Sequence, residues 1–379
     1  MRHVLPLLLA VAAAFTALPR CARAGEPVVT PEIAKFHQDS FVMDLHTDTL
    51  LIIESLGYDF GKRHWAPWGF MPWMGHVDLP RAREGGLDAM FMGLVANPLW
   101  GDGRAQIRET LKFGHDNVLN RYPDQIELAW NAADLTDITH HGKIAVQFLL
   151  EGGHGLGKNA AEALPFLDEL YQSGVRVIGL AHFSNNAFAA SSASSNPENP
   201  HLTADGVAVI KRMNEMGIAI DLAHVHPDSF REIVNLSTSP VIVSHTGVAA
   251  NKAVFRNVED WQIKAVAKSG GVIGIMYAPH WLSSDMNTPI QTVVAHMKHV
   301  KDLVGAQYLA LGSDYDGFIW LPSGMRDVTD QPKLTAAMLE GGFTRDEVKG
   351  ILGENIVRVM KEIERRATKR PARASSGKH

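Results

Sequence analysis

The sequence predicts a (β/α)8 TIM barrel, in which eight parallel strands alternate with helices and close into one ring. Eight short apolar runs recur along the chain, and most are followed by a segment with helical spacing of its apolar residues. Runs that are apolar throughout are typical of strands buried on both faces. Strands alternating with helices indicate a parallel sheet, and 379 residues suit a single barrel domain.

The predicted elements follow one another in the order that a barrel requires. The eight predicted strands cover residues 41–48, 87–94, 143–153, 175–181, 218–222, 241–243, 272–276 and 308–311. Helical spacing covers residues 107–120, 164–170, 203–216, 261–266 and 290–304, and a capping box at Thr344 and Glu347 opens helices that continue to about Arg366. Residues 50–74, rich in Trp, Gly and Pro, are predicted to form a loop, and so are residues 184–200.

The first 24 residues have the features of a cleaved export signal. Arg2 and His3 precede an apolar run of mostly Leu and Ala, and Ala22-Arg23-Ala24 fits the small-x-small cleavage rule. The alternative is a transmembrane anchor, but the run is short for a bilayer span. We therefore expect export to the periplasm or secretion, with Gly25 as the mature N-terminus and no stable membrane anchor.

Composition excludes some partners and sets the domain limits. The net charge of −5 gives no reason to expect a nucleic-acid partner. The single cysteine, Cys21, lies in the predicted signal, so a homodimer of the mature chain would be non-covalent. Residues 25–364 are predicted to form the barrel domain, and the basic residues 365–379 a disordered tail.

Side chains that bind metals recur where the predicted strands end. The strand-end residues are His46, Asp48, Glu151, His182, His224, His245, Tyr277 and Asp314. A lone strand-end His is more often a hydrogen-bonded rim residue, and a lone carboxylate can cap a turn. In a barrel, however, all strand ends meet at one mouth, which is where the active site lies. Together these residues suit two divalent metal ions about 3.5–4 Å apart.

The spacing of the first motif predicts its geometry. Asp44, His46 and Asp48 are two residues apart. In a regular strand their side chains would share one face, and His46 and Asp48 could then bind one ion.

The ordered set of motifs resembles the membrane dipeptidase (renal dipeptidase) family of dizinc metallopeptidases, which have an amidohydrolase-type barrel. The resemblance extends from Asp44 to Arg358, over nearly all of the predicted mature chain. Its matching stretches are Asp44-Leu-His-Thr-Asp48, Glu151-Gly-Gly-His154, Leu180-Ala-His182, Asp221-Leu-Ala-His224-Val225, Ser244-His245, Arg256-Asn-Val258, Gly312-Ser-Asp-Tyr-Asp-Gly317 and Gly353-Glu-Asn-Ile-Val-Arg358.

The resemblance implies two Zn²⁺ ions per chain and assigns their ligands. His46 and Asp48 would bind the first ion, and His224 and His245 the second. Glu151 would bridge both ions. Two such ions lower the pKa of a shared water towards 7 and so generate a hydroxide that attacks a peptide carbonyl.

The resemblance also implies substrate-binding and catalytic roles. His182 would face the substrate and stabilise the oxyanion, and Arg256 would bind the substrate carboxylate with help from Tyr277. Asp314 would act as the acid and base or bind the free amine. Taken alone, without the resemblance, Arg256 fits a surface salt bridge better.

We therefore expect a zinc-dependent dipeptidase that hydrolyses L-Xaa-L-Xaa dipeptides and, by extension, L-Xaa-D-Xaa dipeptides. Two alternatives share the scaffold. One is an exported amidase, deacylase or lactamase at the same metal pair, and the other is a non-hydrolytic maturation factor. Loss of a ligand would favour the last, but every expected ligand is present.

Overall fold

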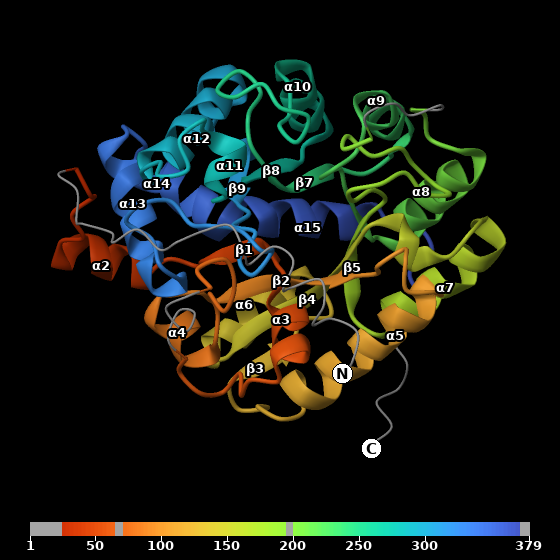
Figure 1. The fold of residues 1–379 in the computed structure, drawn as a ribbon, viewed down its shortest axis with the longest axis horizontal. Coiled ribbons are helices and arrows are strands. Elements are labelled where there is room, and N and C mark those ends of the chain that lie inside the picture. The colour runs from red at the N-terminus through yellow and green to blue at the C-terminus, as the bar shows by residue number, and fades with distance from the viewer. Residues whose placement is uncertain (1–24, 65–70, 195–199, 372–379) are drawn as a thin grey trace.

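The computed structural model describes residues 25–64, 71–194 and 200–371 (Figure 1). The predicted signal at 1–24, two tryptophans of the predicted loop (Trp65 and Trp68) and residues 372–379 lie outside this part. Within the described residues, no helix combines the length and apolar character needed to cross a bilayer.

Eight parallel strands form the predicted closed barrel. They are β1 (Met43–Thr47), β2 (Ala89–Val95), β4 (Ile144–Glu151), β5 (Val175–Gly179), β6 (Ala219–Asp221), β7 (Val241–Thr246), β8 (Val272–Ile275) and β9 (Leu309–Leu311). The ring runs β2-β1-β9-β8-β7-β6-β5-β4 and closes where β2 pairs with β4. Helices surround the strands (Figure 1). The fold prediction is therefore confirmed.

A ninth strand, β3 (Ile126–Leu128), was not predicted. It pairs with the first residues of β4, before β5 joins the same edge at Phe148. It extends the sheet at the beginning of β4 and does not interrupt the ring.

Helices connect the strands as the sequence pattern requires. The described α-helices are α2 (Pro31–Gln38), α3 (Thr49–Leu56), α4 (Leu79–Glu84), α5 (Gly103–Gly114), α6 (Ala132–His140), α7 (Ala160–Gln172), α8 (Ala204–Met216), α9 (Pro227–Leu236), α10 (Asp260–Ser269), α11 (Pro279–Leu282), α12 (Gln291–Val304), α13 (Gln331–Glu340), α14 (Arg345–Lys349) and α15 (Asn355–Arg366). The prediction of a loop from residue 50 was wrong over α3, which begins directly after β1 and buries Leu50, Ile52 and Ile53.

Alternation along the strands divides the core into two parts. Ala145 and Leu149 of β4 belong to the barrel interior, whereas Val146 and Phe148 pack against the surrounding helices. Glu151 is in phase with the interior residues, so its carboxylate points into the barrel at the C-terminal end of β4.

Helix α15 closes the opposite end of the barrel. Its apolar side chains, among them Ile356, Met360 and Ile363, share one cluster with Met43, Ala89 and other residues near the beginnings of the strands. The helix crosses the barrel in Figure 1. It forms a floor, and the strand ends that carry the predicted metal ligands lie at the other end.

Replacing Met360 with Ala is expected to lower the free energy of unfolding by about 2–5 kcal/mol, because it leaves a cavity in a fully buried layer. Urea unfolding followed by circular dichroism measures the change. The exposed neighbour gives a matched control, since Lys361→Ala is expected to change stability by no more than about 0.5 kcal/mol. Equal effects of the two changes would contradict a sealing role for α15.

The beginning of the predicted tail is ordered. Helix α15 continues to Arg366, and the backbone N–H groups of Thr368 and Lys369 donate to the carbonyl oxygen of Glu215 at 3.0 and 2.8 Å. The first residues of the predicted tail thus continue from α15 and bond to the end of α8.

Candidate metal centre

The structure brings together the five predicted metal ligands, with Glu151 at their centre. Its Oε1 lies 3.0 Å from His224 Nε2 and 3.4 Å from His245 Nε2. Its Oε2 lies 3.8 Å from His46 Nε2, and His46 Nε2 lies 3.7 Å from Asp48 Oδ2. Each oxygen of one carboxylate thus faces a different group of ligands.

Two predicted catalytic residues join this cluster. His182 Nε2 lies 3.6 Å from Glu151 Oε2, and Asp314 Oδ1 lies 3.9 Å from His46 Nε2. The ligand atoms of Glu151, His182 and His224 are mutually close enough to hold an ion, and so are those of His46, His245 and Asp314. The His182 side chain is about one quarter exposed, whereas Glu151 is almost fully buried.

Bulges in β1 and β7 turn the side chains of His46 and His245 towards each other at the mouth of the barrel. Strand β1 carries one extra residue against β2 within residues 44–47, and β7 carries one against β8 within residues 243–246. Such bulges turn a side chain away from the regular alternation. The two imidazole rings stack with centroids 3.8 Å apart.

The bulge in β1 overturns the predicted placement of Asp44. Met43 and Leu45 line the barrel interior, so Asp44 between them faces away from it. Its Oδ1 accepts from the backbone N–H groups of His46 and Ser313, both at 3.0 Å. Asp44 therefore joins β1 to the chain after β9 and is not a metal ligand.

Unusual backbone conformations hold two further site residues. His224 has φ of +62° and Asp314 has φ of +66°, values that side chains other than glycine rarely adopt. Strain of this kind concentrates at functional sites, where surrounding contacts maintain it. At Asp314 the backbone N–H donates to the His46 carbonyl oxygen at 3.1 Å, which fixes the two ligand-bearing loops relative to each other.

Buried polar atoms without partners show that metal ions fit this cluster. Within the described residues, His46 Nε2 and Asp48 Oδ1 are buried and form no hydrogen bond. Asp48 is the N-cap residue of α3, yet its side chain does not cap the helix. Unpaired buried groups are costly, and a bound cation would satisfy both.

The electrostatics of the cluster also favour a cation. Burial lowers the pKa of the His46 imidazole, but Glu151, Asp48 and Asp314 outweigh burial and raise this pKa to about 10. The three carboxylates around His46 therefore favour a positive charge at this position. Burial holds the pKa values of His224 and His245 well below their usual range, so both rings are neutral and offer lone pairs to a metal.

A hydrogen-bonded chain behind His245 selects its tautomer. Ser244 Oγ donates to Asp221 Oδ2 at 2.5 Å and lies 2.9 Å from His245 Nδ1. With its own proton directed to Asp221, the hydroxyl accepts from Nδ1, which leaves the lone pair of Nε2 free for a metal. Asp221 Oδ1 also accepts from the Ala223 and Ser244 N–H groups at 3.0 and 2.8 Å. Sequence inspection missed this arrangement, although Asp221 and Ser244 both lie in recognised motifs.

Replacing Ser244 with Ala is expected to weaken binding of one metal ion about 10- to 100-fold, because His245 loses the partner that fixes its tautomer. Competition with a chromogenic zinc chelator measures this affinity. Ser313→Ala is the matched control, since the buried Ser313 hydroxyl after β9 bonds to backbone groups at His46 O and Tyr315 N. If both variants weakened the same ion equally, the tautomer argument would fail.

The remaining predicted residues have different outcomes. Arg256 is buried after β7, donates from Nη2 to the His245 carbonyl oxygen at 2.9 Å, and forms no ion pair within the described residues. The charges of Asp314 and Glu151 oppose the lowering of its pKa by burial, which places the guanidinium near the cluster.

Tyr277 is not brought into the cluster. It is fully buried, its hydroxyl lies 3.2 Å from Gln331 Oε1, and its ring packs edge-on against Tyr315. The hydroxyl is therefore within hydrogen-bond distance of α13, behind the barrel. This geometry does not support the expected contact of Tyr277 with the substrate carboxylate.

Fold and site define a metal-dependent hydrolase, because the mouth of a (β/α)8 barrel holds imidazoles and carboxylates around a shared carboxylate. The family model of membrane dipeptidases (peptidase family M19) matches residues 31–374, and the chain belongs to that family. It is thus a metallopeptidase that acts on dipeptides.

Two curated relatives and one solved structure illustrate the similarity. Dipeptidase tcpJ of Claviceps purpurea is 33% identical over 303 residues, which cover 76% of this chain and 70% of the relative. Dipeptidase verJ of Clonostachys rogersoniana is 32% identical over 247 residues, covering 65% and 62%. A metallopeptidase from Rhodobacter sphaeroides, bound to a phosphinate mimic of L-Ala-D-Ala, shares the fold with a TM-score of 0.74 at 23% identity, covering 86% of this chain and all of that one.

Proposed function

We propose that the protein hydrolyses the peptide bond of L-Xaa-L-Xaa and L-Xaa-D-Xaa dipeptides with two zinc ions per chain. The observation that carries this proposal is the position of Glu151. Its two oxygens face separate groups, His224 and His245 on one side, and His46 on the other. A carboxylate so placed would serve as a shared ligand of two ions.

We assign the donors to two ions. His46, Asp48 and Glu151 would hold one, and Glu151, His224 and His245 the other. When bound, such a pair polarises the peptide carbonyl and lowers the pKa of a water towards neutrality. Nitrogen and oxygen ligands without sulfur suit zinc and similar divalent metals.

The chain's own residues supply the remaining chemistry. Asp314 accepts the proton of the attacking water on its carboxylate and passes that proton to the leaving amine. His182 presents Nε2 at the exposed edge of the cluster, where it donates to the developing oxyanion. Arg256 offers its remaining N–H groups to the carboxylate of the substrate, which restricts the site to short peptides with a free C-terminus.

The proposal also covers the location of the protein and its oligomeric state. Residues 1–24 act as a cleaved export signal, so the mature protein begins at Gly25 in the periplasm or outside the cell. The intact mass of the exported protein tests this cleavage. A non-covalent homodimer is part of the proposal, and light scattering after size-exclusion chromatography measures it.

The decisive experiment combines turnover with metal analysis on one sample. The mature protein is assayed with matched L-L and L-D dipeptides, the second group chosen because a solved relative binds a mimic of L-Ala-D-Ala. Two zinc ions per chain and hydrolysis are expected. Two ions with turnover only of N-acyl amino acids or lactams would replace the dipeptide proposal with an amidase. No tightly bound metal and no turnover after zinc addition would refute the catalytic assignment.

A further inference from the structure

A buried imidazole bonds to the chain segment that carries Asp314. His76 lies between α3 and α4 and is inaccessible to solvent, as is Asp316. The backbone N–H of Asp316 donates to His76 Nδ1 at 3.0 Å, and the backbone N–H of His76 donates to Asp316 Oδ1 at 2.6 Å. Two reciprocal bonds thus join the loop before α4 to the segment after β9.

The direction of these bonds determines the tautomer of His76. Its Nδ1 accepts a backbone proton and therefore carries none of its own. The ring proton is then on Nε2, which lies 3.3 Å from the carbonyl oxygen of Pro72. Because both nitrogens have partners in the chain, the ring is not free to bind a metal ion or a substrate.

The turn formed by residues 314–318 is strained. Asp314, Asp316 and Phe318 have φ of +66°, +69° and +57°, which residues with a side chain rarely adopt. Such conformations persist only where surrounding contacts maintain them. The Asp316 carboxylate provides one more contact, because its Oδ2 accepts from Thr49 Oγ1 at 2.7 Å. Asp316 therefore links the turn to α3 as well as to the loop before α4.

The turn packs directly against two carboxylates of the cluster. A β-carbon at Gly317 would collide with Asp314 Oδ1 and would lie 2.9 Å from Asp48 Oδ2. The Gly317 N–H also donates to the Asp314 carbonyl oxygen at 3.1 Å. A shift of the turn backbone would therefore displace the Asp314 carboxylate directly.

We propose that His76 is a positioning residue for the reaction, which holds the Asp314 carboxylate in place by accepting the backbone N–H of Asp316. The inference rests on the proposed function, in which Asp314 carries the proton. His76 acts only through the turn and has no contact with the substrate in this assignment. A misplacement of about 1 Å can lower a rate about 100-fold, so loss of this bond is expected to lower kcat.

Two substitutions separate the acceptor atom of His76 from the bulk of its ring. His76→Asn keeps an acceptor, Oδ1, near the position of Nδ1, whereas His76→Leu keeps the bulk and leaves the buried Asp316 N–H unpaired. We expect kcat to fall about 10- to 100-fold in His76→Leu and no more than about 3-fold in His76→Asn. Steady-state kinetics with a dipeptide measure both values, and zinc content is expected to remain that of the wild type.

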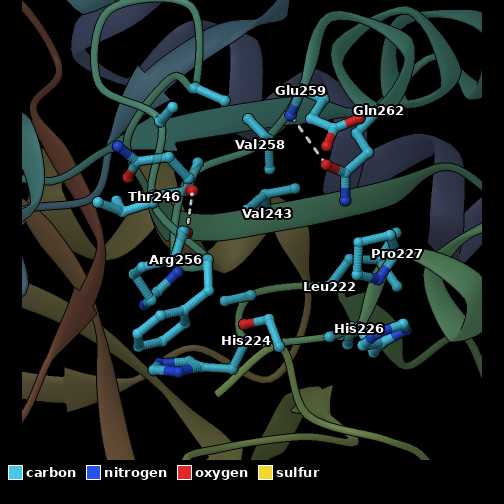
Figure 2. A pocket seen from close by; sticks show the side chains of 18 of the residues that line it. Leu222, His224, His226, Pro227, Val243, Thr246, Arg256, Val258, Glu259 and Gln262 are labelled. Atoms are coloured by element: carbon cyan, nitrogen blue, oxygen red, sulfur yellow. Dashed lines mark hydrogen bonds between the residues drawn. The ribbon is translucent and has the colours of Figure 1, made fainter. Parts of the chain in front are cut away.

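KM is expected to change little, because the residue proposed to bind the substrate carboxylate has separate support. Figure 2 shows Arg256, whose carbonyl oxygen accepts from Thr246 Oγ1 at 3.0 Å. The cavity beside Arg256 is lined by residues between 192 and 262, which include neither His76 nor the turn. A KM within about 3-fold of the wild type is therefore expected in His76→Leu. A higher KM with unchanged kcat would overturn the proposal.

A second buried histidine provides the matched control. His37 is inaccessible to solvent, and its Nδ1 and Nε2 lie 2.8 Å from Thr335 Oγ1 and the Gly85 carbonyl oxygen, respectively. His37→Leu is expected to lower stability as His76→Leu does, yet to keep the wild-type kcat. Equal kcat in His37→Leu and His76→Leu, or in the Asn and Leu variants of His76, would overturn the proposal.

Hydrogen exchange separates this inference from the proposed function, because it needs no turnover. We expect the amides of residues 314–318 to exchange at least about 10-fold faster in His76→Leu than in the wild type or His37→Leu. Faster exchange in a protein that hydrolyses no dipeptide would support the hold on the turn and refute the peptidase proposal. Unchanged exchange, or faster exchange with unchanged kcat in an active enzyme, would refute the positioning role alone.

Discussion

Glu151→Gln is expected to remove both metal ions and to lower kcat/KM by about 1,000-fold or more, which corresponds to about 4 kcal/mol of transition-state stabilisation. The amide is neutral, and its nitrogen is a donor that cannot bind a metal. Both oxygens of Glu151 face imidazoles. In glutamine an NH2 group replaces one of these oxygens, so one group of ligands loses its shared oxygen in either orientation of the amide. Zinc content by mass spectrometry and dipeptide turnover measure the two losses together.

Two further variants make the Glu151 prediction specific. Glu151→Asp keeps the charge on a shorter side chain and is expected to retain more zinc than Glu151→Gln. Glu127→Gln, at an exposed carboxylate in β3 that pairs with Lys143 at 2.9 Å, is expected to retain wild-type metal content and activity. Two zinc ions bound to a folded Glu151→Gln protein would disprove the bridging role.

Asp314→Asn is expected to lower kcat by about 100- to 10,000-fold while the metal ions remain bound, because we propose Asp314 as the proton carrier. Asn is well suited to the test. It tolerates the positive φ of +66° at this position at least as well as Asp, so the change removes charge without altering the backbone. Turnover and zinc content, measured on the same sample, separate a catalytic loss from a loss of metal.

The pKa of Asp314 also predicts the direction in which kcat/KM changes with pH. Burial raises the pKa of this carboxyl well above its usual range, and Asp48 and Glu151 add to the effect while His46 opposes it. A base acts in its deprotonated form, so kcat/KM in the wild type rises with pH through this pKa. Asp314→Asn is expected to lose that rising limb. If Asp314 instead binds the free amine, KM increases, kcat changes little, and the limb remains.

The strands were predictable because the barrel buries both of their faces, which leaves continuous apolar runs such as Ile144–Leu150. The short β3 carries only three residues, with Glu127 exposed between two buried side chains, and gives no such run. Helix α3 was missed for the opposite reason. Its first residues, Leu50 to Ile53, are apolar almost all round, so they lack the polar face that reveals a helix.

Which residues meet in the cluster was predictable, whereas the orientation of their side chains was not. Strand ends meet at one mouth in any barrel, so Glu151 and His245 could be grouped from their positions alone. The argument from spacing assumed a regular pleat, and the bulge after Asp44 broke that assumption. For Tyr277, the partner that removes its hydroxyl from the site is Gln331, which lies 54 residues further along the chain and leaves no local signal.

The floor formed by α15 determines when the protein can first fold. Strand β1 has β9 as a neighbour, and the beginnings of the strands are covered by residues 356–363. A chain emerges from the ribosome with its N-terminus first, so its strands remain open at one end until the last helix has been synthesised. The binding site, at the other end, also needs residues 46 and 314 together. Synthesis halted before residue 355 therefore yields an aggregation-prone chain and not a weakened enzyme.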